Sequence, residues 1–136
     1  MKQTNLNEII ENNVKSLQDL DVNSIEKVAS EILEVKNNEG TLYIAGNGGS
    51  SSTASHFVND LTKATRKTSN KLNIKATCLS DNTSLITAIS NDISYDEIFR
   101  FQIDKNISTR DLLIVISASG NSKNLVKAVD YCKNNR

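Results

Sequence analysis

The sequence predicts an α/β domain built on a parallel sheet. Three short apolar segments, residues 42–46, 73–79 and 111–116, have the length and composition of strands, and segments with helical spacing of apolar residues separate them. The first and third segments run directly into loops rich in Gly and Ser. Strands that alternate with helices pair in parallel through right-handed crossovers. We therefore expect the strand order second, first, third, with both loops on one edge of the sheet.

The composition is that of a single globular domain. The chain has 136 residues, 24% charged and 38% hydrophobic, and its 16 basic residues balance 16 acidic ones, which does not favour a nucleic-acid partner. No apolar run approaches the length of a membrane span or a signal-peptide core, and the two cysteines lack CxxC spacing. We expect a cytoplasmic protein without a membrane partner. We interpret residues 1–136 as one domain, with N-terminal helices over 1–40 and a partial α/β core over 41–136.

Two amphipathic helices are expected before the first strand. Apolar residues recur at helical spacing over residues 5–20, and a second stripe continues to about residue 40. Asn23 and Glu26 have the spacing of a capping pair at the start of the second helix. Helices that precede a sheet are not crossovers, so we expect these two to cover a sheet face or to pack with helices of another subunit.

The loop after the first strand indicates an anion site. Gly48 and Gly49 permit positive φ and close approach of the backbone, and the hydroxyl residues 50–53 can cap the next helix or donate to a ligand. The pattern is neither a Walker motif nor GxGxxG, and many α/β domains carry such a turn without a ligand. His56 and Asp60 are four residues apart and therefore share one face of the helix that follows.

The rest of the chain continues the alternation. We expect a polar loop over residues 65–71, a short helix near residues 85–89, and a further helix that opens with a Ser94–Glu97 capping box. The strand over residues 111–116 is a near-continuous apolar run, typical of a strand buried on both faces. The last helix should turn four residues inward: Leu125, Val126, Val129 and Cys132.

The two Gly/Ser loops together indicate a ligand. In an open parallel sheet, ligands bind at the carboxyl ends of the strands, so two hydroxyl-rich loops at that edge suggest a site for a phosphorylated small molecule. For the second loop, residues 117–122, a plain helix cap is the alternative. Cys78 and Cys132 are interpreted as small buried apolar residues rather than as catalytic thiols.

Three segments of the chain resemble SIS (sugar isomerase) domains: GNGGSSSTASHFVNDL, ISNDISYDEIF and ISASGNS. The likeness runs through nearly the whole chain and is greatest to phosphoheptose isomerases, which interconvert sedoheptulose 7-phosphate and glycero-manno-heptose 7-phosphate. It implies a flavodoxin-like parallel sheet, a homotetramer with active sites between subunits, and one Zn²⁺ ion per site. The pathway implied is heptose biosynthesis for lipopolysaccharide or capsule.

The resemblance also implies roles for individual residues. The sugar would be held by Asn47, Gly48, Gly49, Asn91 and Asp92. The phosphate would be held by Ser117, Ala118, Ser119 and Ser122. His56 would ligate zinc, and Asp60 would both ligate the metal and move the proton.

The chain departs from the family pattern at three points. Asp60 stands where the isomerase usually has glutamate, and Ala118 stands where many members have a hydroxyl residue. The family also takes a glutamine and a second histidine from a late helix, and this chain stops before it. With His56 as its one histidine, we expect the chain to be truncated after the third strand and its helix, and to form an incomplete active site.

Two other functions remain open. Proteins of the same superfamily that associate with the initiator of bacterial replication keep the fold but bind a protein partner without catalysis. They lack the carboxylate at the Asp60 position, so Asp60 favours the enzyme. A sugar-phosphate-sensing domain is the third interpretation, and it needs only the two loops.

Overall fold

The computed structural model describes residues 5–68 and 73–135, with the backbone alone for 64–68. By their contacts, Met1–Ser30 and Glu31–Arg136 form two compact units. The elements, in chain order, are α1 (Leu6–Gln18), α2 (Val22–Asn37), β1 (Thr41–Gly46), α3 (Gly49–Thr68), β2 (Lys75–Cys78), α4 (Thr83–Asp92), the 3₁₀ turn η1 (Tyr95–Glu97), α5 (Arg100–Ile103), β3 (Leu112–Ile116) and α6 (Lys123–Asn134).

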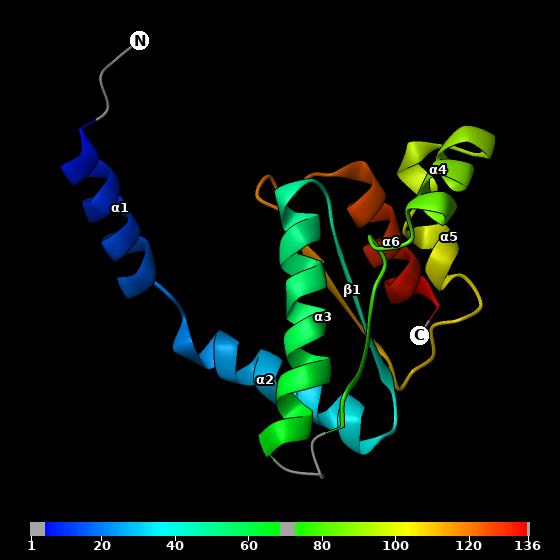
Figure 1. Cartoon of the computed structure of the whole chain (residues 1–136), viewed down its shortest axis with the longest axis horizontal. Coiled ribbons are helices and arrows are strands. Elements are labelled where there is room, and N and C mark those ends of the chain that lie inside the picture. The colour runs from blue at the N-terminus through cyan, green and yellow to red at the C-terminus, as the bar shows by residue number, and fades with distance from the viewer. Residues whose placement is uncertain (1–4, 69–72, 136) are drawn as a thin grey trace. The chain divides into compact units, whose positions relative to one another are not determined.

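The described strands form a parallel sheet in the order β2-β1-β3, as the sequence predicts. Helix α3 covers one face, and α4, α5 and α6 lie on the other (Figure 1). Side chains of a strand alternate between faces, so Ile44 packs with Ala54 of α3, whereas Ala45 packs with Phe99 and Leu125 on the opposite side. Both faces of the central strand are therefore covered.

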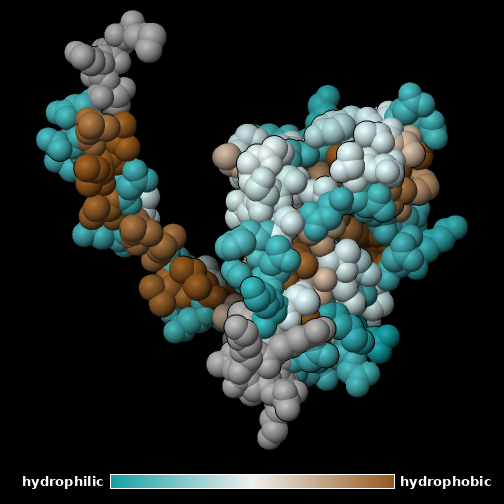
Figure 2. Space-filling view, viewed as in Figure 1, coloured by the Kyte–Doolittle hydropathy of each residue, from teal (hydrophilic) through white to brown (hydrophobic). Residues whose placement is uncertain are grey.

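The N-terminal unit carries a continuous apolar stripe. None of the side chains described for α1 is buried, and Leu6 and Leu17 are 74% and 69% exposed. Figure 2 shows the apolar residues gathered along one side of α1 and onto the start of α2. A stripe of this kind on an amphipathic helix needs a covering surface. Among the described residues, no helix combines the length and the apolarity that crossing a membrane requires.

Two predicted helix boundaries are wrong. Helix α2 begins at Val22, one residue before the expected cap, because Asp21 caps it by accepting a hydrogen bond from the Asn23 backbone N–H at 3.1 Å and one from the Ser24 hydroxyl at 2.6 Å. Helix α3 continues to Thr68, so the predicted loop over 65–71 starts too early, and its residues 69–71 lie outside the described part of the chain.

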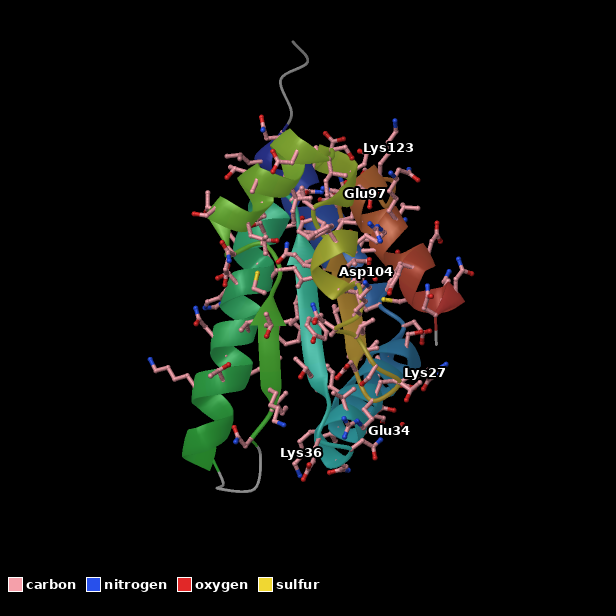
Figure 3. All side chains as sticks on the ribbon, turned by 90° about the vertical axis from the view of Figure 1, so that its right-hand side faces the viewer. Lys27, Glu34, Lys36, Glu97, Asp104 and Lys123 are labelled. Carbon is pink, nitrogen blue, oxygen red and sulfur yellow. The ribbon has the colours of Figure 1, made fainter. Side chains whose placement is uncertain are left out.

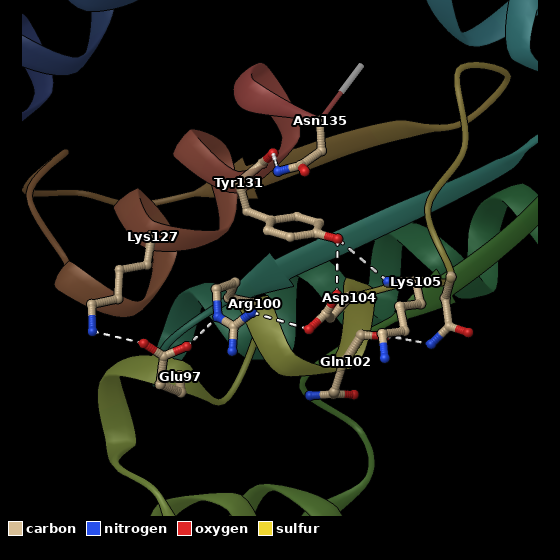
Figure 4. A network of polar contacts seen from close by, with 9 residues as sticks. Glu97, Arg100, Gln102, Asp104, Lys105, Lys127, Tyr131 and Asn135 are labelled. Carbon is tan, nitrogen blue, oxygen red and sulfur yellow. Dashed lines mark hydrogen bonds and ion pairs between the residues drawn. The ribbon is translucent and has the colours of Figure 1, made fainter.

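The predicted capping box at Ser94 and Glu97 does not form. Ser94 makes no side-chain capping bond within the described structure. Glu97 instead forms ion pairs with Lys127 and Arg100, which hold its pKa below the usual value (Figure 4). Two short turns, η1 and α5, replace the single helix that we expected. The ion pairs link these turns to α6.

Strand β3 is half-buried along its whole length, so the prediction of a strand buried on both faces is wrong. Its side chains do contact the apolar clusters on both faces, but it lies at the edge of the three described strands, beside β1, so its burial is partial. Asp111 anchors its start: the carboxylate accepts hydrogen bonds from the Thr41 backbone N–H and from the Ser108 backbone N–H and hydroxyl, each at 2.7 Å. Burial raises the pKa of Asp111, but these hydrogen bonds outweigh burial and lower it.

The inward face of α6 is mostly as predicted. Leu125 and Cys132 are buried and Val129 is half-buried, but Val126 is 41% exposed and points away from the core. Cys78 is also buried, and burial raises the pKa of its thiol. A protonated, enclosed thiol is a packing residue and a poor nucleophile.

Candidate functional site

The two Gly/Ser loops lie together at the carboxyl end of the sheet, as predicted. Gly46 of β1 pairs in register with Ile116 of β3, so the residues that follow each strand leave the sheet side by side. Figure 3 shows Glu97 and Lys123 at one end of the domain and Lys36 at the other. Lys123 opens α6 directly after the second loop and adds positive charge beside it.

The first loop turns tightly into α3. Gly48 has a φ of 54°, and the Ser50 backbone N–H donates to the Asn47 carbonyl at 3.0 Å. A Cβ atom added to Gly48 or Gly49 would meet no described atom within 4 Å. The outer side of this loop is therefore open and leaves room for a ligand to approach the backbone.

The second loop is organised by its own hydroxyl groups. The Ser117 Oγ accepts from the Gly120 backbone N–H at 3.1 Å, and the Ser119 Oγ accepts from the Asn121 backbone N–H at 3.2 Å. The two Oγ atoms are 3.5 Å apart. Ser122 is the N-cap residue of α6, yet its side chain makes no capping hydrogen bond within the described residues. This argues against the plain helix cap, since the hydroxyl that should cap α6 does not.

A part-buried polar contact joins the first loop to the start of α6, directly after the second loop. The amide groups of Asn47 and Asn124 exchange two hydrogen bonds, of 2.9 and 3.0 Å, and the Tyr95 hydroxyl donates to the Asn47 Oδ1 at 3.0 Å. Ser80 adds a link to β2, because its Oγ donates to the Gly46 carbonyl at 2.8 Å. The sequence-based prediction of the site did not include Asn124, Ser80 or Tyr95. An asparagine among the inward positions of α6 was the available signal.

His56 and Asp60 share one face of α3, as predicted. The His56 Nδ1 and the Asp60 Oδ2 are 3.8 Å apart, and their side chains are 79% and 64% exposed. Structural zinc sites use four protein ligands and catalytic sites use three. No group of three His, Cys, Asp or Glu residues within the described chain could hold a metal. The pair therefore fits part of a zinc site only, and further ligands are needed to hold the ion.

Asn91 and Asp92 lie at the carboxyl end of α4. Both are exposed, and the Asn91 side-chain amide donates to the Asp92 carboxylate at 2.9 Å. Tyr95 follows three residues after Asp92, and its bond to Asn47 ties this turn to the first loop. An amide beside a carboxylate offers both donors and acceptors, which suits sugar hydroxyls.

Comparison with known proteins decides the family. Residues 6–135 match the family model of the SIS domain. The chain belongs to this family. It is 40% identical over 132 residues to the probable phosphoheptose isomerase of Thermoplasma volcanium, covering 97% of this chain and 66% of that protein. It is also 40% identical over 129 residues to the phosphoheptose isomerase of Helicobacter pylori strain Shi470, covering 93% and 62%.

Solved structures with the same fold carry the same name. Phosphoheptose isomerase GmhA from Neisseria gonorrhoeae superposes with a TM-score of 0.80 at 31% identity, over 92% of this chain and 63% of that one. A phosphoheptose isomerase from Francisella tularensis gives a TM-score of 0.81 at 26% identity, over 97% and 71%. The SIS-domain chain spans about two thirds of the length of the curated relatives that it matches.

Proposed function

We propose that this SIS domain belongs to a sugar-phosphate aldose–ketose isomerase. Its reaction is the conversion of sedoheptulose 7-phosphate to glycero-manno-heptose 7-phosphate, in cytoplasmic heptose biosynthesis for lipopolysaccharide or capsule. The observation that carries the proposal is that the two Gly/Ser loops meet at one edge of the sheet, where α3 begins and bears the His56–Asp60 pair. The names of the relatives and their 40% identity support the choice of reaction.

The reaction requires a base and an orienting site. A proton leaves the carbon beside the carbonyl, an enediolate forms, and a proton returns to the neighbouring carbon. Asp60 is the proposed proton-transfer group, because its carboxylate is exposed on the face of α3 that also carries His56. Ser117, Ser119 and Ser122 would hold the phosphate and so fix the distance of the reacting carbons from α3.

Sugar phosphates should stabilise the protein against heat through these serines. A ligand at 100 times its Kd adds about 2.7 kcal/mol to the free energy of unfolding, which shifts Tm by several degrees. In differential scanning fluorimetry we expect sedoheptulose 7-phosphate to give this shift and the variant Ser119→Ala/Ser122→Ala to lose it. A matched control is Ser16→Ala/Ser30→Ala, which changes two exposed helix serines that bond only local carbonyls among the described residues. Equal stabilisation by unphosphorylated sedoheptulose would contradict phosphate recognition.

Zinc is a separate proposal. His56 and Asp60 would supply two ligands, and the remaining ligands would come from another subunit or another segment. Bound at this place, the ion would supply electrostatic stabilisation of an oxyanion. Elemental analysis of the purified protein tests the proposal, since His56→Ala should lower the zinc content. Equal zinc content in both proteins would exclude His56 as a ligand.

Self-association through α1 is the proposed use of its apolar stripe, with a tetramer as the expected assembly. Ile10 and Val14 of this stripe are 60% and 48% exposed. A helix that is stable alone in water normally exposes less apolar surface than this. We expect Ile10→Glu/Val14→Glu to be monomeric in light scattering at micromolar concentration. Asn12→Glu, on the polar face of the same helix, should leave the assembly unchanged. A wild-type monomer would refute the proposal.

The non-catalytic alternatives make a different prediction. A partner-binding or sugar-phosphate-sensing SIS domain needs the fold or the loops, but no proton-transfer group. The exposed carboxylate of Asp60 on the proposed substrate side of α3 favours the isomerase. Loss of activity on removal of that carboxylate, argued in the Discussion, separates these functions.

A further inference from the structure

The side chains of Asn47 and Asn124 connect the first Gly/Ser loop to the start of α6, directly after the second loop. Asn47 follows β1 and Asn124 lies in the first turn of α6, so the two residues are 77 positions apart in the chain. Their amides exchange hydrogen bonds of 2.9 and 3.0 Å, and Asn124 is only 2% exposed. A polar group buried this completely costs stability unless its hydrogen bonds are made.

The orientation of both amides is determined by one backbone group. The Leu125 N–H donates to the Asn124 Oδ1 at 2.9 Å as well as to the Ser122 carbonyl at 3.0 Å, and because a backbone N–H is always a donor, the oxygen of the Asn124 amide rather than its nitrogen must face it. The Asn124 Nδ2 is then left to donate to the Asn47 Oδ1, and the Asn47 Nδ2 donates back to the Asn124 Oδ1. The pair therefore has a single arrangement and cannot exchange its donors and acceptors.

Tyr95 extends the contact to a third segment. Its hydroxyl donates to the Asn47 Oδ1 at 3.0 Å, so this oxygen accepts from both α6 and η1. Two residues later in η1, Glu97 pairs with Lys127 of α6 at 2.8 Å (Figure 4). The first loop, η1 and α6 are thus joined to one another by polar contacts, of which the Asn47–Asn124 pair is part-buried and the contacts of Tyr95 and Lys127 are exposed.

We propose that Asn124 is a positioning residue that holds the two Gly/Ser loops in one fixed relation, with Asn47 as its partner and Tyr95 closing the contact. The side chain of Asn47 then fixes the geometry of the first loop. A ligand contacts the backbone of that loop, on the open side of Gly48. When an anion binds at the second loop, the Asn47–Asn124 pair also stabilises the first loop. This inference rests on the proposed function only for the nature of that anion.

The test in the absence of ligand is hydrogen exchange measured by NMR at four hydrogen-bonded backbone amides: those of Ser50 and Ser51, which bond the first loop from the start of α3, and those of Gly120 and Asn121 inside the second loop. Removing the two amide–amide bonds in Asn124→Ala should speed exchange at Ser50 and Ser51 by about 10-fold to 100-fold. Tyr95→Phe removes one hydroxyl and should speed it by about 3-fold to 10-fold. Unchanged rates at Ser50 and Ser51 in both variants would overturn the proposal.

A matched control lies on α6. Tyr131→Phe also removes one tyrosine hydroxyl, which bonds Asp104 at 2.9 Å and contacts neither loop in the described structure (Figure 4). It should leave exchange at Ser50 and Ser51 as in the wild type, and equal acceleration by Tyr131→Phe and Tyr95→Phe would show a general loss of stability instead of positioning. If Asn124→Ala does not fold, Asn124→Asp replaces it. That change keeps the acceptor for the Leu125 N–H but turns an oxygen toward the Asn47 Oδ1, so it should give the same acceleration.

A second measurement adds inorganic phosphate. In the wild type, phosphate should slow exchange in both loops, and in Asn124→Ala it should slow exchange at Gly120 and Asn121 alone. Slowing of both loops in the variant would contradict transmission through the pair. If phosphate changes neither loop of the wild type, anion binding and the proposed function fail, while the exchange rates without ligand still decide whether Asn124 positions the loops.

Discussion

In a protein whose active site is completed by the glutamine and second histidine of the family, Asp60→Asn should lower the exchange of the substrate α-proton with solvent by about 10²-fold to 10⁴-fold, the usual contribution of a general base. Asparagine keeps the size of the side chain and its hydrogen bonding but has no basic oxygen. Binding of the sugar phosphate should be nearly unchanged, because the serines proposed to hold the phosphate are untouched, so the loss should appear in kcat with little effect on KM. The measurement is deuterium incorporation into sedoheptulose 7-phosphate in D₂O.

The control for this prediction is Asp130→Asn, which removes an exposed carboxylate from α6, on the opposite face of the sheet from α3. It should leave proton exchange at the wild-type rate. His56→Ala distinguishes a metal ligand from a base, since activity and zinc content should fall together in that variant. Turnover of Asp60→Asn at the wild-type rate would assign Asp60 to a surface role and would favour the non-catalytic interpretations.

Gly46→Ala should destabilise the protein by about 2–4 kcal/mol, as expected when a methyl group is forced into a packed site. A Cβ atom at this position would lie 2.5 Å from the Ser50 carbonyl oxygen and 2.6 Å from the Ser50 carbonyl carbon. These are backbone atoms at the start of α3, so they can yield only if the loop moves. Urea denaturation monitored by circular dichroism should show a lower midpoint with an unchanged m-value.

Gly49→Ala is the matched comparison, because a Cβ atom there would meet no described atom within 4 Å. Its stability should equal or slightly exceed that of the wild type, since alanine favours a helix more than glycine does. Its affinity for sugar phosphate should nevertheless fall, because the methyl group projects into the space proposed for the ligand. Equal destabilisation by both substitutions would show that the loop is constrained by something other than the close approach at Gly46.

Local pattern was sufficient for the elements and their order. Alternating strands and helices predicted the β2-β1-β3 sheet, and the Gly/Ser composition of the loops predicted that both would lie at its carboxyl edge. The spacing of His56 and Asp60 predicted their shared face, since residues four apart on a helix are neighbours whatever surrounds them. These features depend on short-range geometry, which the order of residues contains directly.

Capping patterns were less informative, because several polar residues near a helix end can compete for the same backbone groups. Asp21 caps α2 in place of Asn23, and Glu97 bonds Arg100 and Lys127 rather than the backbone of Ser94. The apolar run of β3 likewise predicted burial on both faces, but its place at the edge of the described sheet leaves it half-buried. Asp21 is a local competitor, Glu97 is drawn partly to Lys127 of another element, and β3 is half-buried because β1 is its one neighbour among the described strands.

The sequence by itself determined the α/β fold, the two loops and the carboxylate–histidine pair on α3, because periodicity and residue type act over a few positions. Only the tertiary structure decided that Asn47 and Asn124 hold the loops together and that Ser80 ties the end of β2 to Gly46. These partners are 77 and 34 residues apart. Whether two such side chains meet depends on the register of the strands and the packing of helices between them, and no local pattern encodes that distance.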